Sequence, residues 1–163
     1  MNDVEEHIKG WIKNISTIRP ELGNFSICPF SSTATYKVIY SNIDDIMPVN
    51  GCDVVIFVVE DYLRVDEIQF WCDFYDKKYT DYIFLEDCAY TDFHINGVKT
   101  NNGKYNLVLC QKKKKLQESR KILSKSGYYD HWSDEMVTEI LGKDQNIVKK
   151  RDSNPAKSSV HPF

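Results

Sequence analysis

The stretch CDVVIFVVE at residues 52–60 is the feature that most limits what this chain can fold into. Six apolar residues in a row, four of them valine, lie between Asp53 and Glu60. A half-exposed strand alternates apolar and polar residues, whereas a run that is apolar on both faces belongs inside a sheet that is covered on both sides. We therefore expect a central strand here, with helices packed on the sheet around it.

The neighbouring segments predict these helices and the remaining strands. Apolar residues recur at helical spacing in four segments, residues 3–18, 65–79, 116–126 and 133–141. β-Branched and aromatic residues mark further strands at residues 33–40, 81–87, 92–98 and 104–111. We expect the last two strands to form a hairpin through the polar turn KTNNG. The predicted fold class is α/β, a single domain with a mixed sheet of four or five strands covered by helices.

A change of composition near residue 143 divides the chain of 163 residues. We expect residues 1–142 to form one globular domain and the polar, basic residues 143–163 to form a disordered tail. The sequence contains no apolar run long enough to cross a membrane, so we expect no membrane partner. The N-terminus is acidic where a signal peptide would be basic, so we expect no signal peptide. Five cysteines, an odd number without a C-x-x-C pair, favour reduced thiols in the cytoplasm. We expect no cofactor.

The loop SICPFSST at residues 26–33 contains the clearest candidate for chemistry. Cys28 precedes Pro29, which fixes one backbone angle, and Ser31, which can donate hydrogen bonds. A thiol becomes a nucleophile where a helix N-terminus or a cation stabilises its thiolate, so Cys28 is a candidate catalytic residue. The alternative is structural, because free cysteine is among the residues that are most often buried.

The motif CPFS resembles the one-cysteine active site of glutaredoxins, and FHINGVKTNNG resembles the later hairpin of that family. That family needs a helix after the loop, however, where TATYKVIY is strand-like. It also needs a proline before the hairpin strand, which CAYTDF lacks. We therefore disfavour a glutaredoxin-like fold.

The opening helix with its tryptophan, the loop LGNFSICPF and the strand VVIFVV followed by FWCDFY form a second pattern. This pattern resembles a family of small uncharacterised bacterial proteins in which a helix is followed by a Leu-Cys-Pro-Phe loop. The present chain departs from it with Ser26 and Ile27 before Cys28. The resemblance implies a similar fold in the first half of the chain, and it carries no activity.

Charge is distributed unevenly along the chain. Residues 44–92 hold thirteen acids and three bases, whereas residues 93–163 hold seven acids and fourteen bases. In the basic part, four consecutive lysines lie at a predicted helix start, the end at which the helix dipole disfavours cations; they are Lys112, Lys113, Lys114 and Lys115. This run either binds an anion or phosphate group or is simply solvated. A pI near 5.8 and the absence of a nucleic-acid motif argue against a nucleic-acid partner.

Two acidic pairs, Glu60-Asp61 and Glu86-Asp87, each stand at the C-terminal end of a predicted strand. Strand ends in α/β sheets converge on a ligand crevice, and carboxylates are the ligands that hard divalent cations prefer. These four residues are therefore candidate metal ligands. The alternative is that loop starts are acidic because the whole middle section is acidic.

His131 and Trp132 belong to the aromatic corner GYYDHWSD, which either packs as a hinge or binds a partner. Two functions remain open. The first is an accessory or interaction domain whose partner is another protein. The alternative is a thiol-dependent or small-molecule enzyme, with Cys28 as the nucleophile in a cleft lined by the acidic strand ends. An open pocket with a cation or a base beside Cys28 would favour the enzyme.

Overall fold

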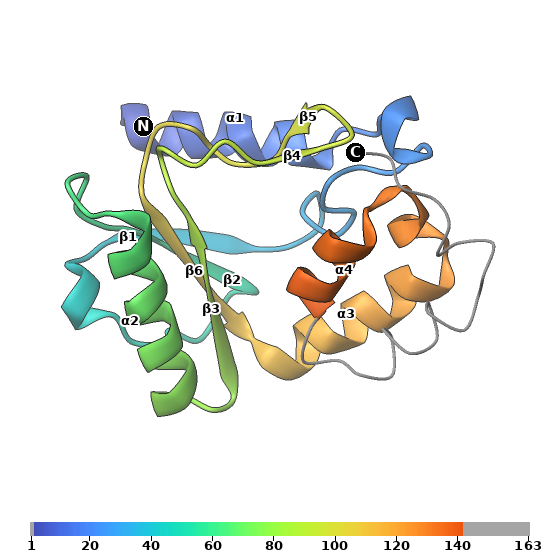
Figure 1. The fold of residues 1–163 in the computed structure, drawn as a ribbon. Coiled ribbons are helices and arrows are strands. Elements are labelled where there is room, and N and C mark those ends of the chain that lie inside the picture. The colour runs from blue at the N-terminus through green and yellow to red at the C-terminus, as the bar shows by residue number, and fades with distance from the viewer. Residues whose placement is uncertain (1, 142–163) are drawn as a thin grey trace.

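A four-stranded mixed sheet with helices on both faces forms the centre of the molecule (Figure 1). The structure is a computed structural model that describes residues 2–141. Its elements, in chain order, are α1 (Asp3–Ser16), η1 (Pro20–Leu22), β1 (Tyr36–Tyr40), η2 (Ile43–Asp45), β2 (Val54–Val58), α2 (Val65–Lys78), β3 (Tyr82–Asp87), β4 (His94–Ile95), β5 (Val98–Lys99), β6 (Leu107–Lys112), α3 (Lys113–Lys125), η3 (Tyr128–His131) and α4 (Asp134–Leu141). The sheet has the order β1-β2-β6-β3, and β4 and β5 form a separate small sheet. The predicted α/β class is confirmed.

β2 lies inside the sheet, as its apolar sequence predicts. It pairs in parallel with β1 and antiparallel with β6, which in turn pairs antiparallel with β3. Val55 and Phe57 of β2 pack in one hydrophobic cluster with α2, while Ile56 and Val58 pack in another cluster with α1. Because successive side chains of a strand point to opposite faces, α1 and α2 cover opposite faces of the sheet.

α1 begins at the cap that the sequence predicts. The Asn2 side chain accepts a hydrogen bond of 2.9 Å from the backbone N–H of Glu5, which satisfies one free donor of the first turn. Ile8, Trp11 and Ile15 are buried, and they share a cluster with side chains of β2 and β6. After α1 the chain passes through the loop that contains Cys28 and enters β1.

α2 covers the other face and is tied to the segment before β2 by a buried tyrosine. Ile68, Cys72 and Tyr75 are the buried residues of this helix. The Tyr75 hydroxyl donates to the backbone carbonyl of Ile43 at 2.7 Å and accepts from the backbone N–H of Ile46 at 3.2 Å. Both bonds are buried, so they hold η2 and its neighbours against α2.

A second, smaller core lies at the other side of the molecule from α2, where Figure 1 shows α3 and α4. We call it the C-terminal cluster, and its buried residues are Leu22, Ile95, Tyr128, Tyr129, Trp132 and Val137. It joins η1, the β4–β5 hairpin, η3 and α4. The Tyr128 hydroxyl donates a hydrogen bond to the backbone carbonyl of Ile27, which fixes the loop immediately before Cys28.

The expected hairpin between residues 92–98 and 104–111 is wrong. β6 pairs with β2 and β3, and the hairpin is instead formed by β4 and β5. Its turn residues are Asn96 and Gly97, with φ angles of 49° and 80°, the signs that a two-residue type I′ turn requires. The apolar β6 segment gains burial on both faces by entering the main sheet.

Three further expectations concern the chain as a whole. All five cysteines are free, in agreement with the expected reduced thiols. Within the described residues, each helix is too short or too polar to cross a lipid bilayer. The predicted tail at residues 143–163 lies outside the residues that the structure describes.

Candidate functional site

An apolar pocket of about 360 Å³ opens between α1, residues 28–34 and the start of α3. Its floor is the face of the sheet that α1 covers, formed by Val54 and Ile56 of β2 and Leu109 of β6. The other apolar lining residues are Trp11, Ile12, Ile15, Phe30, Ala34, Tyr36 and Leu116. A concave site of this size with a largely apolar lining is typical of small-molecule sites.

The charged lining residues gather where β6 passes into α3. Val54 lies opposite Gln111 in the β2–β6 pairing, so the start of β2 and the end of β6 meet at this end of the pocket. Lys112 is the last residue of β6, and Lys115 lies in the first turn of α3. We call these two lysines the cationic rim, and both contribute to the lining together with Asp53. Lys112 pairs with Tyr82 on the face of the sheet that α2 covers, so its side chain points away from the apolar floor.

Asp53 neutralises part of this rim. Its carboxylate forms an ion pair with the Lys115 ammonium and accepts hydrogen bonds from the backbone N–H of Thr35, at 2.8 Å, and from the Thr35 hydroxyl, at 3.1 Å. The bond to Lys115, followed by those to Thr35, lowers the pKa of Asp53 to about 2. The carboxylate is therefore ionised at neutral pH and remains the resident partner of Lys115.

Cys28 lies in the wall of the same pocket. Its backbone N–H donates to the carbonyl of Ile15 at 2.9 Å, and its own carbonyl accepts from the backbone N–H of Ser31 at 3.1 Å. The Ser31 hydroxyl adds a bond of 2.7 Å to that carbonyl. The structure thus brings Cys28 into one pocket with Lys112 and Lys115 of the lysine run, two candidates that the sequence analysis treats separately.

The thiol of Cys28 does not have the environment of an activated nucleophile. Burial raises the pKa of Cys28, and hydrogen bonds from Phe30 and Ser31 and the charge of Arg120 only partly oppose this effect. The thiol is therefore protonated at neutral pH, and the nucleophile is the thiolate. Cys28 acts in this setting as a polarisable part of the apolar wall.

The two acidic pairs do not line this pocket. β2 and β3 run in the same direction on either side of β6, so Glu60-Asp61 and Glu86-Asp87 lie at one edge of the sheet, as expected. Val58 and Asp87 are both level with Leu107, at the opposite end of β2 from Asp53. The expected cleft with Cys28 between acidic strand ends is therefore corrected: the charge that acts on the Cys28 thiol is that of Arg120, and the charged residues in the lining of its pocket are Asp53, Lys112 and Lys115.

Three of the four candidate metal ligands bind neighbouring polar groups. Glu60 accepts a hydrogen bond of 2.9 Å from the backbone N–H of Ile43, and Glu86 accepts one of 3.1 Å from the side-chain amide of Gln69. Asp87 accepts a hydrogen bond of 2.9 Å from the backbone N–H of Asn102. Burial raises the pKa of Asp87, and the Asn102 bonds oppose this rise. Across residues 2–141, no group of three or more His, Cys, Asp or Glu side chains is placed to hold a metal ion. The metal site stays a prediction that this geometry does not strengthen.

The aromatic corner is packed inside the C-terminal cluster. Trp132 is only 7% exposed, and Tyr128 and Tyr129 are buried beside it. His131 is half-buried, and it lies so close to Gly23 that any side chain at that position would collide with its imidazole. The packing agrees with a hinge and leaves the indole of Trp132 little surface for a partner.

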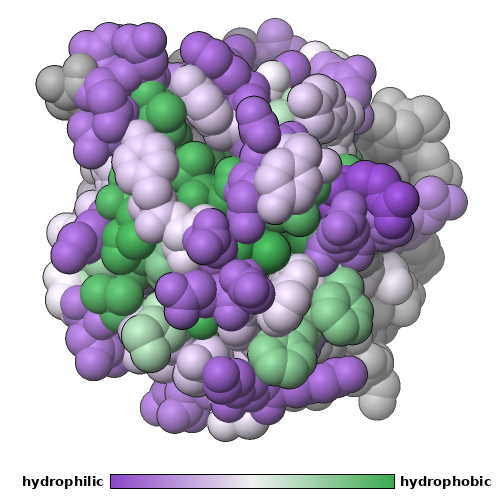
Figure 2. Space-filling view, turned by 90° about the vertical axis from the view of Figure 1, so that its left-hand side faces the viewer, coloured by the Kyte–Doolittle hydropathy of each residue, from purple (hydrophilic) through white to green (hydrophobic). Residues whose placement is uncertain are grey.

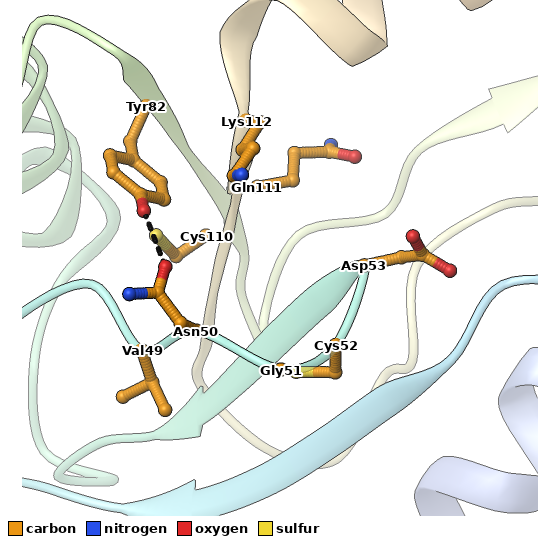
Figure 3. A pocket seen from close by; sticks show the side chains of 9 residues that line it. All are labelled: Val49, Asn50, Gly51, Cys52, Asp53, Tyr82, Cys110, Gln111 and Lys112. Atoms are coloured by element: carbon orange, nitrogen blue, oxygen red, sulfur yellow. Dashed lines mark hydrogen bonds between the residues drawn. The ribbon is translucent and has the colours of Figure 1, made fainter.

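A second pocket, of about 350 Å³, lies beside the same strand ends (Figure 3). The Tyr82 hydroxyl donates to the side-chain oxygen of Asn50 at 3.1 Å across it, and Figure 3 shows the Cys110 side chain beside this bond. In Figure 3 the Asp53 side chain points away from Tyr82 and Asn50. This pocket lacks the apolar floor of the first one, so we place the candidate site in the first.

The chain matches no protein-family model, no curated protein and no solved structure. The resemblance to the bacterial family with a Leu-Cys-Pro-Phe loop therefore stays a prediction. The loop after Cys28 leads into strand β1, which agrees with disfavouring the glutaredoxin fold. Function must accordingly be inferred from the site.

The sequence analysis does not single out two residues of the site. Asp53 appears there only as the polar boundary of the apolar run, and Trp11 only as the tryptophan of the opening helix. Their roles depend on contacts of long sequence separation, such as the pair between Asp53 and Lys115. The sequence signal for Asp53 is its position as a charged residue directly before an otherwise apolar central strand.

Proposed function

We propose that this protein is a binding domain for a small, largely apolar molecule, which it holds in the pocket beside Cys28. The single observation that carries the proposal is the largely apolar lining of an open pocket of about 360 Å³, contributed by α1, the sheet, the Cys28 loop and α3. Leaving such a surface in contact with water is unfavourable. An apolar occupant would remove it from water.

The raised pKa of Cys28 favours binding over thiol catalysis at this site. Enzymes that use cysteine stabilise the thiolate, and here burial acts in the other direction. The charge of Arg120 and the hydrogen bonds from Phe30 and Ser31 oppose that effect without reversing it. We therefore rank a binding function above the thiol-dependent enzyme.

The test is a titration with the neutral fluorescent probe N-phenyl-1-naphthylamine. We expect saturable binding that Ala34→Phe abolishes, because Ala34 lines the pocket and the added ring would fill it. Ser32→Phe is the matched control: Ser32 is exposed in the same loop and is not part of the lining. Equal binding by both variants, with unchanged thermal unfolding, would sink the proposal.

A second candidate, interaction with another protein, is supported by the outer face of α2. Phe70 and Phe74 are 64% and 44% exposed there, and Trp71 stacks edge-on against both rings. Figure 2 looks at the side of the molecule that carries α2, η2 and β1, and it shows hydrophobic side chains exposed between hydrophilic ones. Exposed aromatic side chains of this kind are enriched in protein interfaces.

This second candidate fits a partner in a reducing compartment such as the cytoplasm, since all five cysteines are free. The test is cross-linking in a lysate with the native chain and with Phe70→Ser combined with Phe74→Ser. A partner captured equally well by both chains would exclude α2 as the interface. Tyr90→Ser, at another exposed aromatic residue, is the control.

A further inference from the structure

We infer that Asn50 is a site of spontaneous covalent modification, at which the side-chain amide is lost and aspartate or isoaspartate takes its place. The chain contains three Asn-Gly dipeptides, at residues 50–51, 96–97 and 102–103. Glycine favours this reaction because it has no side chain that blocks the approach of its own backbone nitrogen to the asparagine. The fold leaves the first dipeptide open to the reaction and protects the other two. The inference is independent of the ligand-binding function proposed above.

The reaction consumes only water, with hydroxide as the base. Hydroxide removes the backbone proton of Gly51, and the nitrogen attacks the side-chain carbonyl carbon of Asn50. A C–N bond forms and closes a succinimide ring, while the bond to the amide nitrogen breaks. That nitrogen takes a proton from water and leaves as ammonia. Water then adds to either ring carbonyl and opens the ring to aspartate or isoaspartate, and no atom changes its oxidation state.

Asn50 and Gly51 are accessible and unconstrained. They lie in the loop between η2 and β2, outside every helix and strand. Asn50 is exposed, and a side chain at Gly51 would meet no atom within 4 Å. Of the residues that the structure describes, none accepts a hydrogen bond from the Gly51 N–H. Hydroxide can therefore reach this N–H, and the loop can adopt the ring geometry without breaking a helix or a strand.

A hydrogen bond from Tyr82 also favours the attack at Asn50. The Tyr82 hydroxyl donates to the side-chain oxygen of Asn50 at 3.1 Å, and Figure 3 shows the two groups facing each other. Negative charge develops on this oxygen when the Gly51 nitrogen attacks, and a donor placed there stabilises that charge. Tyr82 therefore lowers the barrier to ring closure.

Asn96 lacks these features. It lies with Gly97 in the turn of the β4–β5 hairpin, where the pairing of Ile95 with Val98 fixes the backbone on both sides. Its amide nitrogen donates to the backbone carbonyl of Glu21 at 3.0 Å. Its side-chain oxygen is buried and accepts no hydrogen bond from the described part of the chain. Charge that develops on this oxygen would be neither solvated nor bonded, which is unfavourable.

Asn102 is held at both ends of its amide and is only 8% exposed. Its side-chain oxygen accepts hydrogen bonds from the backbone N–H groups of Lys104 and Tyr105, at 3.0 and 2.7 Å. Its nitrogen donates to the carbonyl of Tyr105 at 2.8 Å and to the Asp87 carboxylate. Turning the carbonyl carbon toward Gly103 would break these bonds, so ring closure is disfavoured.

The product at residue 50 differs from the native chain in charge. Hydrolysis places a carboxylate in the pocket that Tyr82 and Lys112 also line. Within residues 2–141, no carboxylate forms an ion pair with Lys112. The modified chain therefore gains one exposed negative charge in a pocket that already contains a cation, and we expect it to stay folded.

The decisive experiment follows the loss of each amide in the full chain by peptide mass spectrometry during incubation at pH 8. We expect Asn50 to lose its amide about tenfold faster than Asn96 or Asn102, which corresponds to a barrier lower by about 1.4 kcal/mol. In the chain unfolded by guanidinium chloride, the three amides should be lost at similar rates. Equal rates in the native chain would overturn the inference. A lead of Asn50 that persists unchanged on unfolding would also overturn it, because the fold would then not be the cause.

Two variants at residue 50 identify the modified species. Ion-exchange chromatography separates the chain that has gained a negative charge, and Asn50→Asp marks the position at which it elutes. Asn50→Gln should remove this acidic species, because glutamine would have to close a larger ring. An acidic species that forms equally fast in Asn50→Gln would overturn the site.

The role of Tyr82 is tested by Tyr82→Phe, which removes the donor and keeps the ring. Loss of the amide at Asn50 should become several-fold slower, while the rates at Asn96 and Asn102 stay the same. Tyr62→Phe, at a side chain 75% exposed, is the matched control, and circular dichroism establishes that both variants fold. An unchanged rate at Asn50 in Tyr82→Phe would overturn the role of Tyr82.

Discussion

Lys115 and Asp53 form an ion pair that joins the first turn of α3 to the residue before β2. The pair lies at the polar end of the pocket, so it couples the position of α3 to the edge of the binding site. Removing the carboxylate should therefore affect both the acid stability of the fold and the affinity of the site for anions.

The first prediction concerns acid stability. The pKa of Asp53 is lowered to about 2 in the folded chain from an unfolded value of about 3.9. A lowered folded-state pKa stabilises the fold above the unfolded pKa, and this contribution is lost as the pH falls through the folded one. Urea unfolding from pH 5 down to pH 2 should show native stability converging on that of Asp53→Asn. A gap that stays constant over this range would contradict the prediction.

The second prediction uses the same variant for ligand binding. Asp53→Asn removes the resident partner of Lys115, so octyl phosphate, an alkyl anion, should bind several-fold more tightly, because the exposed carboxylate no longer competes for the ammonium. Binding of neutral octanol should not change. Calorimetry measures both, and a weaker affinity for octyl phosphate would show that Asp53 assists the ligand.

The third prediction concerns Cys28. Because burial raises the pKa of Cys28, its alkylation by iodoacetamide should reach half its maximal rate at a higher pH than in the urea-unfolded chain. Peptide mass spectrometry identifies the modified residue. Cys28→Ser should retain binding of N-phenyl-1-naphthylamine within about threefold, which corresponds to less than 1 kcal/mol. A half-point below that of the unfolded chain would restore the thiol-dependent enzyme as the better hypothesis.

The fourth prediction tests a buried amide at the acidic end of the sheet. The Asn106 side chain donates to the carbonyl of Glu60 at 3.0 Å and accepts from the N–H of Ala89 at 3.0 Å. Asn106→Leu leaves these backbone groups unpaired, so the free energy of unfolding should fall by about 3 kcal/mol. Asn50→Leu, at an exposed position, should cost less than about 1 kcal/mol. Urea denaturation measures both, and equal losses would contradict the prediction.

The fifth prediction concerns the contact behind the Cys28 loop. Tyr128→Phe removes the hydrogen bond to the carbonyl of Ile27 and should lower the free energy of unfolding by about 1 kcal/mol. It should also weaken binding of N-phenyl-1-naphthylamine, because the loop forms part of the pocket wall. Tyr62→Phe, at a side chain 75% exposed, is the control. Unchanged affinity in Tyr128→Phe would show that the loop holds its position without this bond.

The elements with strong local patterns could be predicted from the sequence. The apolar run of β2, the helical stripe of α1 and the cap at Asn2 each depend on residues that are close in the chain. Such patterns reflect burial and backbone geometry directly. The predicted hairpin is wrong because Asn96-Gly97 and KTNNG are both sequences that favour turns. The choice between them depends on the pairing of β6 with β2 and β3 in the main sheet, which a local pattern does not contain.

The site was harder to predict, because its residues come from four separate parts of the chain. Cys28 and Lys112 are candidates on local grounds, but their meeting in one pocket depends on how α3 leaves β6. The raised pKa of Cys28 depends on burial, which the motif CPFS does not encode. For the acidic pairs, the sequence predicts that they lie at the same edge of the sheet, because both stand at strand ends. It does not predict that this edge lies away from Cys28.

The bond between Tyr128 and Ile27 joins residues 101 positions apart, and this separation has a consequence for biosynthesis. Every strand of the main sheet has been synthesised once Lys112 is made. The wall that carries Cys28 lacks its support until η3 has also left the ribosome. A nascent chain can therefore pair its sheet early while the pocket floor is still open to water, so the period between these two events is when the apolar floor is most exposed to aggregation.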